Sequence, residues 1–156
     1  MIQCKVAVLN ERQLAVLTAV CDTFIPSLEM ESDAHGFYRR RSSDLNIPAR
    51  MQEILEHAAT VRDRDQLKLV LNLLDNPLIN SMWGGIPCSI LDMRLEQRTR
   101  LLQDWANSAL PLRRKAISAL RRTANFLYYT VTDEAGSNPN WTAMGYPGAN
   151  PQGESA

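Results

Sequence analysis

Residues 111–131 read PLRRKAISALRRTANFLYYTV and carry a pronounced helical pattern. Pro111 suits the first position of a helix, and neither glycine nor proline interrupts the next twenty residues. Apolar side chains spaced three and four apart fall on one stripe of such a helix: Ile117, Leu120, Ala124, Leu127 and Val131. The opposite side holds Arg114, Lys115, Ser118, Arg121, Arg122 and Asn125. The stretch therefore predicts a long amphipathic helix with a buried seam and a basic outer face.

The composition of the whole chain is that of one folded domain. Of its 156 residues, 45% are hydrophobic and 22% are charged, both ordinary for a globular protein. Because 17 basic residues balance 17 acidic ones, no net field favours nucleic acid or an anionic membrane. No apolar run approaches the roughly 20 residues that span a bilayer, and the opening residues do not resemble an export signal. We therefore expect a cytoplasmic protein without a membrane span.

Helical patterns also fill the chain before residue 111. Asn10 and Gln13 form a plausible capping box for a helix that Pro26 closes, and further helices are expected from Pro48, near 65–74 and over 92–108. Residues 78–85 are interpreted as an apolar turn ending in a glycine pair. The only alternation of apolar and polar residues is a weak one at 4–9. The sequence predicts an all-α fold, an irregular bundle of five or six helices.

The composition changes after residue 131. Residues 132–156 hold four of the seven glycines and three of the eight prolines, yet they include Trp141 and Tyr146. Such a segment is too rich in glycine and proline to build its own core, and exposed aromatic rings need a surface to cover. We therefore divide the chain into a helical domain, 1–131, and an extended strap, 132–156, that docks on a partner. The alternative is that Trp141 folds back onto the helical domain.

No residue is assigned a catalytic, cofactor-binding or metal-binding role. The three cysteines, Cys4, Cys21 and Cys88, share no CxxC spacing and are interpreted as small buried hydrophobes. His35 and His57 lack the neighbours that a metal site requires. Residues 37–44, with two aromatics and three arginines, either bind phosphate or nucleic acid or form a solvated, salt-bridged face.

Three residues of the long helix do not fit its simple pattern. Arg113 falls on the apolar stripe and near the helix N-terminus, where a cation is disfavoured. It is either a snorkelling side chain or a functional one. Phe126 and Tyr129 lie well off the stripe, so they are expected to face a second surface.

Short segments along nearly the whole chain resemble the N-terminal helical region of long-chain fatty alcohol oxidases, flavoenzymes of the glucose-methanol-choline oxidoreductase group. In chain order they are LTAVCDTFIPS at 17–27, Phe37-Tyr38 with Ser42-Ser43-Asp44 and Ile47-Pro48, LLQDW at 101–105, Leu112-Arg113, and Asp133-Glu134, Gly136, Asn138-Pro139, Trp141 and Gly145-Tyr146. The chain is also similar to the third subunit of gluconate 2-dehydrogenase, a separate small helical chain that accompanies a flavin subunit. This chain stops at Ala156, where a single-chain oxidase would continue into its flavin-binding fingerprint.

The resemblance implies a non-catalytic small subunit of a two-chain, FAD-dependent alcohol or sugar dehydrogenase or oxidase. No cofactor is expected in this chain; FAD would lie in the catalytic partner, and the assembly would be a hetero-oligomer. The expected partner interface comprises Arg113, Arg114, Arg121, Arg122, Phe126, Tyr129, Trp141 and Tyr146. Two alternatives remain: the N-terminal helical domain of a longer single-chain alcohol oxidase, and an independent helical adaptor or nucleic-acid-binding protein.

Overall fold

The computed structural model describes residues 7–147, which form seven α-helices and two short 3-10 turns and include no strand. The elements are α1 (Glu11–Phe24), η1 (Ser43–Leu45), α2 (Ile47–His57), α3 (Val61–Asp75), α4 (Pro77–Gly84), η2 (Ile90–Asp92), α5 (Leu95–Ala106), α6 (Pro111–Thr130) and α7 (Pro139–Ala143). The predicted all-α class is confirmed. None of the helices in this part of the chain is long and apolar enough to cross a membrane.

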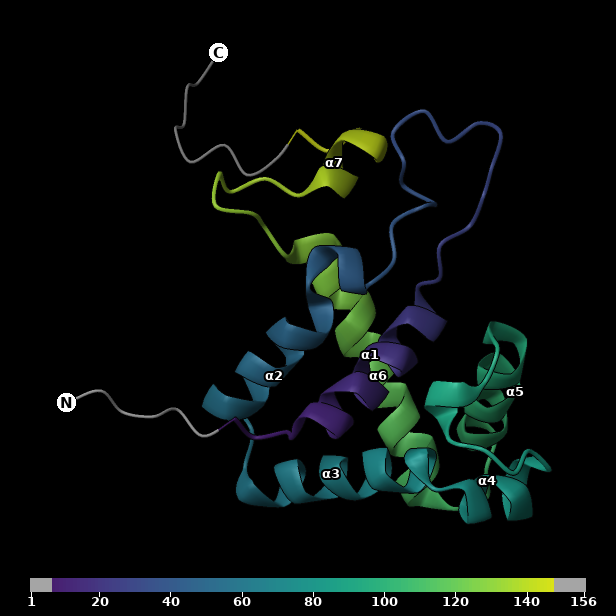
Figure 1. The fold of residues 1–156 in the computed structure, drawn as a ribbon. Coiled ribbons are helices and arrows are strands. Elements are labelled where there is room, and N and C mark those ends of the chain that lie inside the picture. The colour runs from purple at the N-terminus through teal and green to yellow at the C-terminus, as the bar shows by residue number, and fades with distance from the viewer. Residues whose placement is uncertain (1–6, 148–156) are drawn as a thin grey trace.

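Helices α1 and α6 cross at the centre of the molecule (Figure 1). α6 contacts α1, α2, α3 and α5, so it is the element on which most of the bundle packs. Its predicted seam is buried at Ile117, Leu120, Ala124 and Leu127, which are at most 7% exposed, whereas Val131 is half-buried. The long helix and its apolar stripe are thus confirmed.

The predicted capping box of α1 is present. The Asn10 side chain accepts a hydrogen bond from the backbone of Gln13, and the Gln13 side chain accepts one from the backbone of Asn10. Asp22, near the other end of α1, accepts hydrogen bonds from the hydroxyls of Ser42 and Ser43 and from the Ser43 backbone. α1 therefore anchors the beginning of η1 as well as its own first turn.

Cys21 is confirmed as a buried small side chain. It is fully buried in the core, with its sulfur 3.5 Å from that of Met51, and burial raises the pKa of its thiol to about 12. Since the thiolate is the nucleophile, we expect no alkylation of Cys21 by iodoacetamide in the native protein at mildly alkaline pH. In guanidinium, Cys21 should react fully. Peptide mass spectrometry measures both, with half-buried Cys88 as the internal comparison; native alkylation of Cys21 as fast as that of Cys88 would contradict the prediction.

The interpretation of residues 78–85 as a turn is wrong, because Pro77–Gly84 is helix α4. The Asn76 side chain accepts hydrogen bonds from the backbones of Leu78 and Ile79, Pro77 occupies the first turn, and Gly85 closes the helix with φ +67°. Together with α7 in the tail, this helix raises the count to seven within residues 7–147, instead of five or six.

The described part of the predicted strap folds back onto the end of α6. It contains the short helix α7, and Asn138 and Asn140 are fully buried. The indole N–H of Trp141 donates to the carbonyl oxygen of Tyr129 at 2.8 Å. The segment is therefore not extended throughout, and Trp141 follows the alternative in which it returns to the helical domain. Docking on a partner stays a prediction, and residues 148–156 of the strap lie outside the described residues.

Candidate functional site

The eight predicted interface residues do not form one patch. Arg113 and Arg114 lie in the first turn of α6, whereas Tyr129 lies near its last residue. Sixteen positions separate Arg113 from Tyr129, which corresponds to about 24 Å along a helix axis. Arg121 and Arg122 lie between, on exposed positions of α6. The molecule therefore presents two candidate surfaces, one at each end of α6.

The end of the molecule beside the last turns of α6 is built around Tyr128. Its side chain is 4% exposed, burial raises its pKa, and its hydroxyl lies 3.0 Å from the carbonyl oxygen of Phe37 and 3.2 Å from that of Arg40. The Phe37 ring packs edge-on against Tyr128 and roughly parallel to Tyr129. These contacts hold the loop that precedes η1 against α6.

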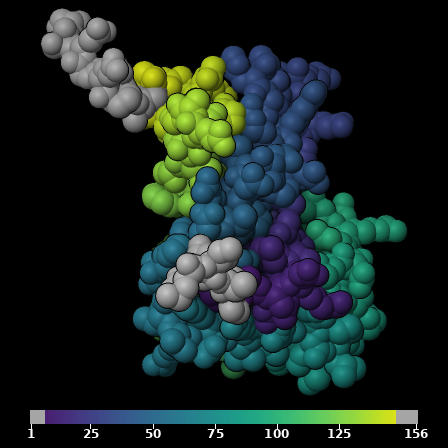
Figure 2. Space-filling model, turned by 60° about the vertical axis from the view of Figure 1, so that its left-hand side comes forward, coloured from purple at the N-terminus to yellow at the C-terminus, as the bar shows by residue number. Residues whose placement is uncertain are grey.

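Arg40 joins this loop to the tail. Its guanidinium donates to the side-chain oxygen of Asn140 at 2.9 Å and to the carbonyl oxygen of His35. Figure 2 shows the loop and the tail side by side above the helical body. Arg41 pairs with Asp44 at 3.8 Å. Two of the three arginines at 39–41 thus have partners within the chain, as in the salt-bridged interpretation of this cluster.

Several large side chains are exposed at this end, and we call five of them the aromatic end: Tyr38, Phe126, Tyr129, Met144 and Tyr146, between 43% and 64% exposed. Trp141 is half-buried and packs edge-on against Tyr146, with ring centroids 5.3 Å apart. Apolar surface gathered in this way is typical of a binding surface. Four predicted interface residues, Phe126, Tyr129, Trp141 and Tyr146, lie at this end of the molecule, and their contact with a partner stays a prediction. Tyr38 and Met144 are exposed at the same end but are not among the predicted residues.

Arg113 is placed quite differently from the other predicted interface residues. It is 9% exposed, and its guanidinium carbon lies 3.2 Å from the centroid of the Trp83 ring and 5.0 Å from that of Trp105. Its own chain therefore covers most of it. Arg114 is exposed and donates to the carbonyl oxygen of Ser108 at 2.9 Å.

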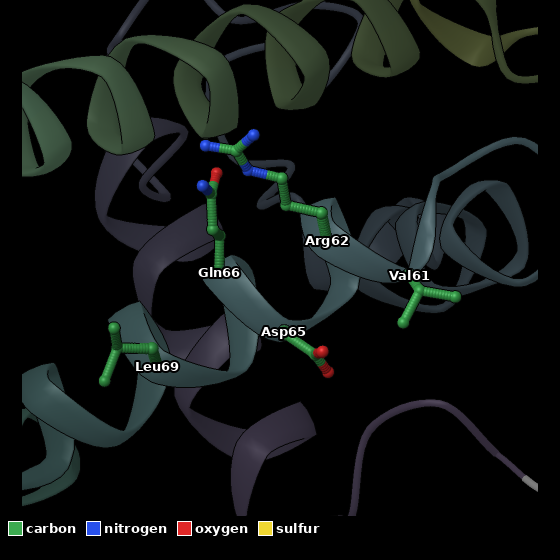
Figure 3. Close-up of a pocket in the computed structure, with 5 residues that line it drawn as sticks. All are labelled: Val61, Arg62, Asp65, Gln66 and Leu69. Carbon is green, nitrogen blue, oxygen red and sulfur yellow. The ribbon is translucent and has the colours of Figure 1, made fainter.

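A groove of about 750 Å³ runs between α2, α3 and α6. Apolar side chains such as Leu67, Val70 and Leu120 form much of its lining. A shallower hollow on the outside of α3 shares Arg62 and Gln66 with it, and Figure 3 shows these two side chains extending toward α6. Neither space brings together a nucleophile and a base, so neither defines a reaction.

The histidines and acidic residues do not assemble into a site within residues 7–147. No group of three His, Cys, Asp or Glu side chains in this range could hold a metal ion. His35 and His57 are exposed and lie on different elements.

The fold and its surfaces thus define a small all-helical protein whose clearest feature is an exposed aromatic end. The sequence profile of the family gluconate 2-dehydrogenase subunit 3 matches residues 11–148, and the chain belongs to this family. It is also similar to two long-chain-alcohol oxidases of Arabidopsis thaliana, FAO4A, with 28% identity over 150 residues, and FAO1, with 26% identity over 162 residues. These matches cover 86% and 88% of this chain but 21% of each oxidase. No solved structure matches the chain.

Proposed function

We propose that this chain is the non-catalytic helical subunit of a two-chain, FAD-dependent alcohol or sugar dehydrogenase or oxidase of the glucose-methanol-choline group. The family membership over residues 11–148 carries the proposal. Hydride transfer from the carbinol carbon to the flavin would take place on the partner. The role of this chain is to cover part of the folded flavin subunit and thereby stabilise it, because a protein that binds only the folded form shifts the folding equilibrium toward that form.

The aromatic end supports this role because it offers the kind of surface that protein interfaces use. Aromatic residues are enriched in the cores of interfaces, where a few of them supply much of the binding energy. Phe126 is 64% exposed and Tyr146 is 51% exposed, so both are accessible to a partner. We therefore place the flavin subunit over the aromatic end.

The similarity to the two plant oxidases favours a second candidate, the N-terminal helical domain of a longer single-chain alcohol oxidase. This chain spans about a fifth of the length of those relatives, 21% in each case. In that arrangement the same aromatic end would contact the flavin domain of its own chain. The cytoplasmic address inferred from the sequence stays a prediction under either candidate.

Co-purification from the source cells tests the proposal. The chain, tagged at its native locus, should co-purify with one flavoprotein, and the purified complex should reduce a dye when an alcohol or sugar is added. The chain produced alone should show neither flavin absorbance nor turnover. Denaturing gels separate the two candidates, since a tagged band at 17.6 kDa plus the mass of the tag supports the subunit and a band several times larger supports the single-chain enzyme. Flavin bound to the chain alone would contradict both.

A further inference from the structure

Arg113 is a buried cation with no anionic partner among residues 7–147. It is 9% exposed, and the described chain gives it no hydrogen bond or ion pair, only the rings of Trp83 and Trp105. Burial of the guanidinium lowers the pKa of Arg113. Cation–π contact offsets part of the cost of desolvating a guanidinium, but a buried charge is ordinarily paired or hydrogen-bonded.

Two buried hydrogen-bond donors of this cluster have no acceptor in the described chain. One is the Nη2 group of Arg113 and the other is the indole N–H of Trp105, a residue only 1% exposed. Unpaired buried donors are rare in native proteins, and each one calls for an explanation. Both donors belong to one cluster of side chains, since the guanidinium carbon of Arg113 lies 5.0 Å from the centroid of the Trp105 ring.

The start of α6 makes the surroundings more positive still. Leu110 occupies the N-cap and supplies no side-chain acceptor for the free N–H groups of the first turn. The positive end of the helix dipole therefore lies beside the guanidinium, an arrangement that disfavours a cation and favours an anion. The helix end, the guanidinium and the indole N–H all favour an anionic group that accepts hydrogen bonds.

The rim of this site is apolar. Trp83, whose ring lies against the guanidinium, is 40% exposed, so its indole is the accessible part of the cluster. We propose that Arg113 and Trp105 bind a carboxylate that is carried on an apolar group, which packs against Trp83. A guanidinium binds a carboxylate through two parallel hydrogen bonds, and a single arginine matches a single negative charge. This inference does not depend on the identity of the catalytic partner.

Fluorescence of the two tryptophans tests the site directly. The chain has three tryptophans, so the Trp141→Phe variant leaves Trp83 and Trp105 as the only emitters. We expect a saturable change of emission with sodium hexanoate, a weaker affinity for acetate, and no change with sodium chloride at the same ionic strength. Hexanol, which has a similar chain without the charge, is the matched control. A response to hexanol equal to that to hexanoate, or no response to any carboxylate, would overturn the proposal.

Variants of Arg113 assign the response to the guanidinium. In the same background, Arg113→Met should weaken hexanoate binding at least tenfold. Arg113→Lys keeps the charge but loses the planar guanidinium, so its affinity should lie between those of the Arg113 parent and the Met variant. Circular dichroism checks that each variant is folded. If the Met variant does not fold, the Lys variant still measures the contribution of the guanidinium. Unchanged affinity in a folded variant would exclude the proposed role.

Two peptides distinguish the sources of the carboxylate. Acetyl-Leu-Glu-Leu-amide should bind and acetyl-Leu-Gln-Leu-amide should not if a protein side chain supplies the group. Binding of hexanoate without binding of the acidic peptide would identify a small free acid as the ligand. Both outcomes support the carboxylate site, whereas equal binding of the two peptides would count against it.

Discussion

Replacing Asn138 with Ala is expected to lower the free energy of unfolding by about 3 kcal/mol, because two buried backbone groups would lose their partners. The Asn138 side chain is fully buried and donates to the carbonyl oxygens of Tyr128 and Val131, at 3.1 and 2.7 Å. Its own oxygen accepts from the backbone of Asn140 at 2.8 Å. The Asn140 side chain also donates to the carbonyl oxygen of Tyr128, so this oxygen keeps a partner in the variant. The two groups that lose their partner are the carbonyl oxygen of Val131 and the backbone N–H of Asn140.

Denaturation in urea, followed by circular dichroism, measures this loss, and the melting temperature should fall by roughly 10 °C. Asn125→Ala is the matched control, since Asn125 is exposed on α6 and its side chain makes no hydrogen bond within the described chain. Surface changes of this kind stay within about 0.5 kcal/mol of wild type. If Asn138→Ala were as stable as Asn125→Ala, the tail would not hold the end of α6.

The parts of the fold that depend on local pattern were predictable. The seam of α6 and the capping box at Asn10 follow from residues three and four positions apart, which the sequence displays directly. The anomaly of Arg113 was visible for the same reason. Its packing was not, because Trp83 and Trp105 reach it only through the tertiary arrangement of α4, α5 and α6.

The two missed helices share a signal that the sequence does carry. α4 and α7 both begin with Asn-Pro, at residues 76–77 and 138–139. In each case the asparagine caps the helix with its side chain and the proline occupies the first turn. The sequence analysis predicts a helix only near 65–74 before the first pair and a turn at 78–85 after it. One asparagine can end one helix and begin the next, since Asn76 is the C-cap of α3 and the N-cap of α4.

The composition of the aromatic end could be predicted only in part. Phe126 and Tyr129 stood out because they leave the apolar stripe, and Trp141 and Tyr146 because they interrupt a segment rich in glycine and proline. Tyr128 was missed, although it is the buried centre of this region. Its role depends on carbonyl groups of Phe37 and Arg40, which lie 91 and 88 positions away in the chain. No local pattern reports such a contact.

The largest effect on binding is expected from the double variant Phe126→Ala, Tyr146→Ala. Both rings are exposed, 64% and 51%, and neither side chain makes a hydrogen bond within the described chain. Their removal should therefore change the free energy of unfolding by less than about 1 kcal/mol. Anchors at the centre of an interface cost about 2 kcal/mol or more each when truncated. Affinity for the flavoprotein should consequently fall by about 1,000-fold if the two losses add.

Calorimetric titration of the purified flavoprotein with each variant measures this change. Val61→Ala, Leu69→Ala is the matched control, because it also removes two exposed apolar side chains, 72% and 47% exposed, from α3 at the opposite end of the molecule (Figure 1). This control should bind as the wild type does, since α3 lies far from the aromatic end. Wild-type affinity in the Phe126, Tyr146 variant together with weakened binding in the control would move the partner to the α3 side, and the aromatic end would then need another explanation.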